Sequence, residues 1–551
     1  MPDDTEISPA AKAILDVMNY RPAVDYDESP VRAREIVSLL LIIALSDIAI
    51  YRGEGFAGYA ALTFGLPILL LIGVPTKRPK LSTWVLGLLL AGATARLAWC
   101  GSGLSLLSGL VVLFSFSMSL VGRTPYVLHA AVFASQTFAA GHHGLNHYWT
   151  SMARVKPSAR VQNVFAVILP IVTVLVFGTL FIFANPDLAK AINTRLSDFF
   201  EFVNQWWTEL APELLEILFC IAAGWIAIGL LRPILPEETT DDDSTSGAPA
   251  VQPDAATAKV EDESVPEPTA LFDAFRNTLV VLTVLFAAYL AFEFQTLWFR
   301  EFPEGFHYSG YAHEGAAWLT VALGLATVML SIMFRGSVLR DPRMSLLRKL
   351  SWAWSLENVI LALAVYNRLS IYVNFNGMTR MRTIGLLGIT AVLVGFLLVV
   401  RKITRRHDFR WLVRRQLWTL AFAIYLYSVL PIDAWVMRHN VNRVLSGDLT
   451  PSVQISVHQT SAEGVLQLLP LMDCKNEIIR EGVKAILALY QDYSENLAAE
   501  HAKLGWTSHQ IADESLLDAL QESQDTWAEY KDQARRSAAI TRFHEYTFQW
   551  F

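Results

Sequence analysis

Three histidines in one short segment come nearest, among all residues of this sequence, to the spacing of a metal site. His142, His143 and His147 lie within the segment 126–149. His143 and His147 are four residues apart, so one helical face presents both, and imidazole nitrogen is a common Zn²⁺ ligand. The spacing is not that of the zinc motif HExxH, and no catalytic carboxylate is nearby. We therefore expect no metal or other cofactor, with hydrogen bonding at the lipid headgroups as the favoured role.

Charged side chains within apolar runs are the second candidate for chemistry. There are four of them, Asp47, Arg96, Glu293 and Glu357. An ionisable group in hydrocarbon is costly, so it either pairs with an opposite charge or lines a polar path. We expect pairing with Arg96 or Arg368 inside the bundle. A polar path for a transported ligand is the alternative.

A polar turn between two apolar runs is the most individual stretch of the chain. It covers Leu361–Arg382, LALAVYNRLSIYVNFNGMTRMR. Gly377 can supply a positive φ for the turn, and the Thr379 hydroxyl can cap the helix that follows. We predict a helical hairpin closed at this point.

Three arginines flank this turn and need partners. Arg368, Arg380 and Arg382 stand at the end of one apolar run and the start of the next. We expect them to anchor to lipid headgroups or to carboxylates such as Glu314. An anionic ligand or a lipid headgroup bound by the cluster is the alternative function.

Composition places these residues in a multi-pass membrane protein. The chain has 551 residues, of which 53% are hydrophobic and 17% charged, with a mean hydropathy of +0.36. Soluble domains carry about 25% charged residues. The net charge of −7 and the confinement of basic residues to loops argue against a nucleic-acid partner. Three dispersed cysteines form neither a disulfide framework nor a zinc signature.

We predict an all-α, polytopic helical membrane bundle of about eleven spans, with a small helical extramembrane C-terminal domain. A span needs about 20 mostly apolar residues. The expected spans are Ile36–Ile50, Phe56–Val74, Leu81–Trp99, Leu104–Val121, Val164–Ala184, Leu214–Leu231, Thr278–Trp298, Ala316–Phe334, Trp352–Tyr372, Ile384–Val400 and Leu417–Trp435.

The chain divides into five parts on this pattern. They are a polar N-terminal segment (1–34), a first membrane half (35–234), a linker (235–269), a second membrane half (270–436) and a helical soluble domain (437–551). The linker is acidic and has no aromatic residue, so we predict disorder. Within the first half, 187–211 is an expected amphipathic helix, which lies either on the membrane surface or packed on the end of the bundle.

Loop charges orient the predicted spans. Short cytoplasmic loops are rich in Lys and Arg, and the strongest basic loop is Arg401–Arg415. The basic loops fall on one side only if the segment 126–149 does not fully cross, so we predict that it is re-entrant or interfacial. This gives a multi-pass protein of the inner (plasma) membrane, with the N-terminus cytoplasmic and the C-terminal domain extracytoplasmic.

Several motifs together resemble a family of bacterial multi-pass membrane proteins, domain of unknown function 4173, which is related to group 4153. The resemblance covers about residues 160–500 and implies a bacterial inner-membrane protein with no established reaction. The residues at its motif positions are Pro303, Gly305, Tyr308 and Tyr311 before one span, Gly377, Thr379 and Arg382 at the turn, and Asn440 or Asn442 with Arg443 after the last span.

The favoured function is a non-enzymatic membrane component that sits in the lipid bilayer. Its C-terminal domain (437–551) would bind a protein partner; the sequence does not specify the oligomeric state. One alternative is a transporter or a lipid- or anion-handling membrane protein. The other is a membrane-embedded metal-dependent enzyme using the three histidines.

Overall fold

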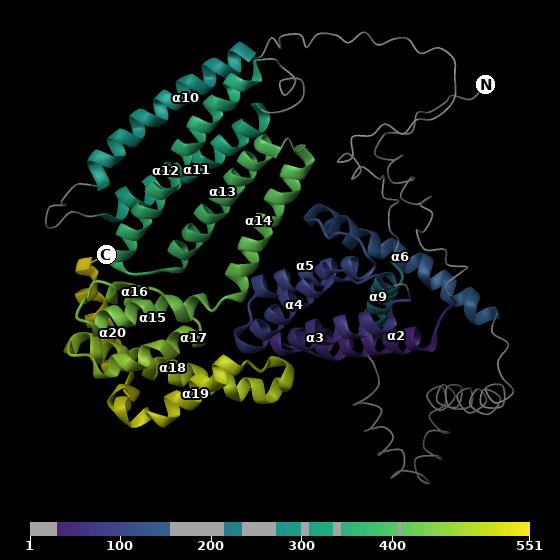
Figure 1. Ribbon diagram of the computed structural model, residues 1–551. Coiled ribbons are helices and arrows are strands. Elements are labelled where there is room, and N and C mark those ends of the chain that lie inside the picture. Colours follow the sequence, from purple (N-terminus) through teal and green to yellow (C-terminus); the bar gives the residue numbers. More distant parts are fainter. Residues whose placement is uncertain are drawn as a thin grey trace, which may run out of the picture. The chain divides into compact units, whose positions relative to one another are not determined.

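The computed structural model describes residues 30–75, 77–154, 214–233, 272–298, 308–333, 343–405, 407 and 409–550, all of which are helical or connecting segments (Figure 1). The predicted disordered linker, the amphipathic helix 187–211 and the span Val164–Ala184 lie outside these residues. So do Pro303 and Gly305. Tyr308 and Tyr311 belong to the first turn of α11, but their side chains lie outside the described part.

Six of the described helices are long and apolar enough to cross a membrane, by length and composition, which is consistent with a membrane protein. Each coincides with an expected span. They are α3 (Phe56–Gly73), α4 (Leu81–Cys100), α5 (Gly103–Leu120), α10 (Phe272–Glu293, continued by the π-helix η3, Phe294–Trp298), α12 (Met344–Asn376) and α13 (Arg380–Arg405).

The other apolar helices are shorter or less apolar, so the predicted total of about eleven spans is not reached in the described residues. They are α2 (Ala33–Ser46, continued by the π-helix η1, Asp47–Tyr51), α6 (Val127–Arg154), α9 (Leu214–Leu231) and α11 (Tyr308–Met333). α6, which contains the segment 126–149 except Tyr126, is one continuous helix and does not pass as a span. Its placement at the membrane stays a prediction.

The last expected span, Leu417–Trp435, crosses a break between two helices that pass as a candidate span only together. α14 (Phe409–Val429) stops before Pro431, and α15 (Ile432–Leu445) leaves at 65° to it. Proline cannot continue the ladder of backbone hydrogen bonds, so the helix breaks there. Apolar residues of α15, Met437, Val441 and Val444, are buried in the core of the C-terminal helices. We count all of α15 in the C-terminal helical body, because its residues from Met437 onward belong to that core.

The C-terminal body is a compact set of helices around one apolar core. Val483, Leu487, Trp527 and Phe543 are among its fully buried side chains. After α15 it comprises α16 (Ser452–Val457), α17 (Ala462–Val465), η5 (Leu466–Asp473), α18 (Glu477–Leu504), η6 (Trp506–Ser508), α19 (Ile511–Glu522), η7 (Gln524–Lys531), α20 (Gln533–Thr547) and η8 (Phe548–Trp550).

Contacts between residues divide the chain into two compact units. Their boundaries differ from the predicted division into two membrane halves separated by the linker. The first unit holds α2, η1, α9, the C-terminal part of α3 and most of α6. The second holds α4, α5 and everything from α10 onward, with the start of α3 and of α6. Two helices of the expected first membrane half, α4 and α5, therefore pack with the second half.

In the first unit, a buried ion pair fixes one end of the α2–α9 pair. Arg232 donates to both carboxylate oxygens of Glu35, at 2.5 and 2.9 Å, and the Tyr148 hydroxyl of α6 donates to the same carboxylate. Glycines let α6 approach α9 closely, because a Cβ at Gly141 would lie 2.5 Å from Trp225. Pairing and hydrogen bonding make burial of these charges tolerable.

In the second unit, the C-terminal body packs on the ends of the spans. Arg96, near the end of α4, forms a two-pronged ion pair with Glu463 of α17, at 2.5 and 2.9 Å. The Gln510 side-chain amide bonds the backbone at Leu97 and Gly101. The body is thus joined to α4 as well as to α14, from which it continues.

A second buried ion pair joins α10 to α12, which lie side by side (Figure 1). Arg368 donates to Glu293 at 2.6 and 2.5 Å, and the Tyr289 hydroxyl bonds the same carboxylate. The side chains of Glu293 and Arg368 are only 1% and 5% exposed. Glu293 thus pairs with Arg368, one of the two arginines expected as partners of the charges within the spans.

Removing one partner of this pair should cost far more than removing an exposed one. Arg368→Met leaves Glu293 buried and unpaired, so we expect the free energy of unfolding to fall by about 3–5 kcal/mol. Arg276→Met breaks the exposed pair with Asp273 on α10 and should cost less than about 1 kcal/mol. Chemical denaturation in detergent micelles measures both. Equal losses for the two variants would contradict the structural role, whereas adding Glu293→Gln to Arg368→Met should recover most of the loss.

Candidate functional site

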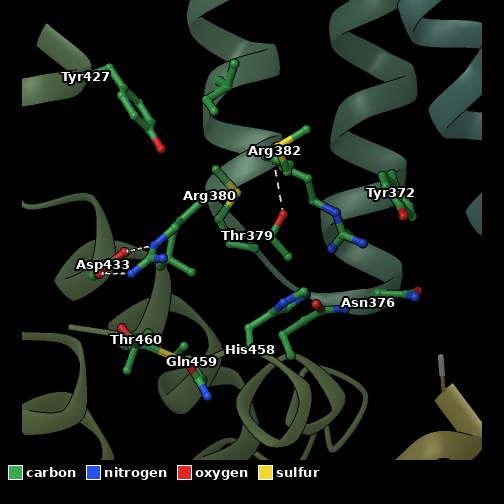
Figure 2. Close-up of a pocket in the computed structure, with 16 residues that line it drawn as sticks. Tyr372, Asn376, Thr379, Arg380, Arg382, Tyr427, Asp433, His458, Gln459 and Thr460 are labelled. Carbon is green, nitrogen blue, oxygen red and sulfur yellow. Dashed lines mark hydrogen bonds and ion pairs between the residues drawn. The ribbon is translucent and has the colours of Figure 1, made fainter. Parts of the chain in front are cut away.

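A cavity of about 470 Å³ lies where the α12–α13 turn meets the C-terminal body (Figure 2). We call it the hinge pocket. Its walls come from α12, the turn, α13, α14, α15, α16 and the segment after α16. Its polar lining comprises Tyr372, Asn376, Thr379, Arg380, Arg382, Tyr427, Asp433, Gln454, His458, Gln459 and Thr460.

The turn has the predicted conformation. Gly377 ends α12 with a φ of +89°, and a Cβ there would lie 2.6 Å from the Asn440 side chain. Thr379 caps α13, because its hydroxyl accepts a hydrogen bond from the Arg382 N–H at 3.2 Å. A residue other than glycine would be strained at position 377 and would displace Asn440.

Two side chains of α15 close the turn from the opposite side. Asn440 accepts from the Met378 N–H at 2.7 Å and donates to the Met378 carbonyl at 2.9 Å. Arg443 donates to the carbonyls of Val373 and Asn374 in the last turn of α12, and the Val373 carbonyl also accepts from the Gly377 N–H. The motif residues of the turn and those of α15 thus form one cluster. Of the two candidate asparagines, Asn440 bonds the turn.

Arg380 has a carboxylate partner in the pocket. It forms a two-pronged ion pair with Asp433 of α15, and the Ser461 N–H donates to the same carboxylate at 3.0 Å (Figure 2). Burial raises the pKa of Asp433, but the hydrogen bonds from Arg380 and Ser461 outweigh it and hold this pKa below its usual value. Asp433 therefore stays ionised and neutralises Arg380.

Arg382 has no carboxylate partner among the described residues. Its side chain stacks on the Tyr372 ring, with Cζ 3.7 Å from the centroid, and one Nη donates to the Gly377 carbonyl. Nε is buried and has no acceptor. The residue is only 5% exposed, so the structure buries a positive charge without an ionic partner. Such a charge is costly unless an anion compensates it.

Two further groups add to the polarity of the hinge pocket. Asn376 is 3% exposed and donates to the Trp550 carbonyl at 3.1 Å, while its Oδ1 is buried without a donor. Burial and the nearby charges of Arg382 and Arg380 lower the pKa of His458. The pocket thus offers one uncompensated cation, an unused acceptor and a neutral imidazole.

The histidines of α6 do not form a shared site. His142 stacks on Trp225, and His147 Nδ1 lies 3.3 Å from a guanidinium nitrogen of Arg232. The described residues include no group of three His, Cys, Asp or Glu side chains arranged to hold a metal ion. Nothing in the geometry favours the metal-dependent enzyme.

The remaining predicted polar groups have local roles. Asp47 is 3.1 Å from Arg52, which also binds Glu216 of α9. Glu357 is half-buried on α12, with no hydrogen-bond partner for Oε2 in the described residues.

Sequence reasoning missed the acidic partners and the imidazole. Glu463 and His458 follow the last expected span, where charged residues are typical of a solvated surface, and Asp433 lies near the C-terminal end of that span, Leu417–Trp435. A sequence signal for Asp433 was its place two residues after Pro431, since a proline breaks a helix.

Comparison with known proteins gives one match. The family described as domain of unknown function 4153 matches residues 39–470, which include every helix from α3 to α17 and the whole hinge cluster. No curated protein and no solved structure matches the chain.

Asn440→Ala should loosen the turn. It leaves the Met378 N–H and carbonyl without partners, which costs about 1–3 kcal/mol and speeds local amide exchange roughly ten- to hundredfold. Hydrogen–deuterium exchange of peptides covering residues 374–382 measures the effect. Asn442→Ala is the matched control, because Asn442 is exposed on the same helix and its side chain forms no bond to the turn. Equal exchange in the two variants would rule out the closing role of Asn440.

Proposed function

The chain belongs to the DUF4153 family, and we propose that it is a non-enzymatic multi-pass membrane protein that binds an anionic lipid headgroup in the hinge pocket. The observation that carries the proposal is the buried, unpaired Arg382. The proposal takes up the lipid- or anion-handling alternative. The narrower resemblance to group 4173 stays a prediction.

The charge balance of the hinge pocket is the first observation that supports an anionic ligand. Asp433 is the only acidic residue in the lining, and Arg380 already neutralises it. One positive charge at Arg382 is left over, and a guanidinium binds phosphate through charge-assisted hydrogen bonds. An anion in the pocket would give the orphaned Arg382 Nε an acceptor.

Position is the second support, and it favours a lipid over a soluble anion. The pocket lies at the ends of two candidate spans, α12 and α13, where headgroups would meet the protein. Exposed apolar side chains, Met381 and Ile384, border it on the α13 side. They are placed to contact acyl chains while the phosphate reaches Arg382. The unused Asn376 Oδ1 can accept a hydrogen bond from a headgroup hydroxyl.

The C-terminal body supplies half of this pocket. We propose that its main role is to close the site on the spans of its own chain, through Asp433 and Asn440. A further protein partner for residues 437–551 stays a prediction. The transporter alternative has less support, because Asp47, Arg96 and Glu293 each have an ion-pair partner of their own.

We also propose the predicted orientation in the inner membrane. The C-terminal body contacts Gly55, Gly101 and Met378, which lie at span ends on one side. The basic residues of Arg401–Arg415 lie at the other ends of α13 and α14. Positive charge on the cytoplasmic side would make the hinge pocket extracytoplasmic.

Arg382→Gln should weaken binding of phosphatidylglycerol about tenfold, because the charge-assisted bonds to phosphate are lost. Native mass spectrometry of the detergent-solubilised protein, titrated with the lipid, measures the affinity. Arg401→Gln makes the same charge change at the other end of α13 and should leave this binding event unchanged. Gln459→Trp should block the pocket while keeping every charge.

Three outcomes would contradict the proposal. They are no loss with Arg382→Gln, an equal loss with Arg401→Gln, and equal affinity for zwitterionic phosphatidylcholine. If glycerol phosphate binds as tightly as the lipid, the ligand is a soluble anion and the lipid assignment is wrong.

Binding should strengthen as the pH falls from about 7 to about 5. The lowered pKa of His458 keeps it neutral in the empty pocket at pH 7. A bound anion favours the protonated form, so binding takes up a proton and the affinity rises, roughly three- to tenfold, on acidification. The lipid phosphodiester and the Asp433 carboxylate stay ionised over this pH range. The change in lipid affinity therefore reports on the protonation of His458. The same pH slope in His458→Gln would contradict the assignment.

A further inference from the structure

A second cavity, of about 330 Å³, lies at the other end of α14 from the hinge pocket. We call it the basic cavity. It forms between the first turns of α14 and the start of α6, within the second unit. Its lining comprises Tyr126, Val127, Leu128, His129, Phe409, Arg410, Val413, Arg414 and Leu417.

The charged side chains that line the basic cavity are all positive. The lining contains two arginines, Arg410 and Arg414, and no acidic residue. The Arg414 guanidinium lies 4.5 Å from the centroid of the Tyr126 ring, and no carboxylate of the described residues pairs with it. Stacking on an aromatic face holds the guanidinium in place without neutralising it.

The apolar part of the lining points to the rest of the ligand. Val127, Leu128, Val413 and Leu417 supply aliphatic walls, and Leu128 is 56% exposed at the rim. A cavity with aliphatic walls and a stacked guanidinium matches a molecule with a phosphate at one end and hydrocarbon at the other. Basic pockets between membrane helices bind anionic headgroups for this reason.

We propose that the basic cavity binds the phosphate of an anionic phospholipid from the leaflet opposite to the hinge pocket. Arg414 holds the phosphate, Arg410 adds positive charge at the entrance, and the aliphatic walls contact the first part of the acyl chains. The inference does not rest on the hinge pocket, because no residue lines both sites. An acidic protein segment would also meet the arginines, but it would not need the aliphatic walls.

The chain offers a matched pair of variants for the test. Arg414 and Arg415 are neighbours on α14, and each stacks on an aromatic ring, but Arg415 is exposed and does not line the cavity. Arg414→Gln and Arg415→Gln therefore remove the same charge from the same helix. Val413→Trp fills the cavity and keeps both charges.

The measurement is native mass spectrometry of the full chain in detergent, titrated with phosphatidylglycerol. We expect Arg414→Gln and Val413→Trp to weaken one lipid-binding event about tenfold, and Arg415→Gln to leave it unchanged. As a control for folding, the thermal unfolding of each variant without lipid must match that of the unmodified chain. If Arg414→Gln or Val413→Trp fails to fold, the other of these two variants decides the result.

Other outcomes overturn the inference. Equal losses for Arg414→Gln and Arg415→Gln would show diffuse attraction to the basic surface. Equal affinity for phosphatidylcholine would exclude recognition of an anion. Displacement of the lipid by an acidic peptide at equal concentration would make the cavity a protein-binding site. Loss of the hinge-pocket event in Arg382→Gln is a separate result, since the two variants affect different binding events.

Discussion

The second unit depends on the way the backbone at the α12–α13 turn obtains its hydrogen bonds. A helix that ends leaves carbonyls without partners, and a turn leaves further amides without partners. Here Asn440 on α15 bonds the N–H and carbonyl of Met378, and Arg443 on the same helix bonds the carbonyl of Asn374 and adds a second bond to that of Val373. The spans and the C-terminal body therefore hold each other in one arrangement, and neither surface would be satisfied alone.

This closure has an electrostatic consequence. With α15 against the turn, Arg382 is buried and Arg380 lines the same pocket, but α15 provides only one carboxylate, Asp433. Arg380 takes it. The charge of Arg382 has no carboxylate partner, and its buried side chain contacts the Gly377 carbonyl and the Tyr372 ring. A buried charge without an opposite charge beside it is costly to the folded state. The uncompensated charge is what turns a structural contact into a candidate binding site.

Whether the sequence could predict a feature depends on how far apart in the chain the interacting residues lie. Apolar runs, a glycine and a threonine act over a few residues, so six spans and the geometry at Gly377 and Thr379 could be predicted. The break at Pro431 was missed, because the apolar character of Leu417–Trp435 continues through it. The pairing of Arg96 with Glu463 joins residues 367 positions apart, and no local pattern carries it. The unpaired state of Arg382 depends on all its neighbours in space, so only the structure could show it.

The most direct measurement is an electron cryomicroscopy map of the protein in nanodiscs that contain phosphatidylglycerol. The account predicts headgroup density in the hinge pocket, with a phosphate oxygen within about 3 Å of Arg382 Nε. It also predicts the C-terminal body closed on the turn through Asn440. A map that shows the body closed and the guanidinium of Arg382 bonded only to protein and water would contradict the central claim.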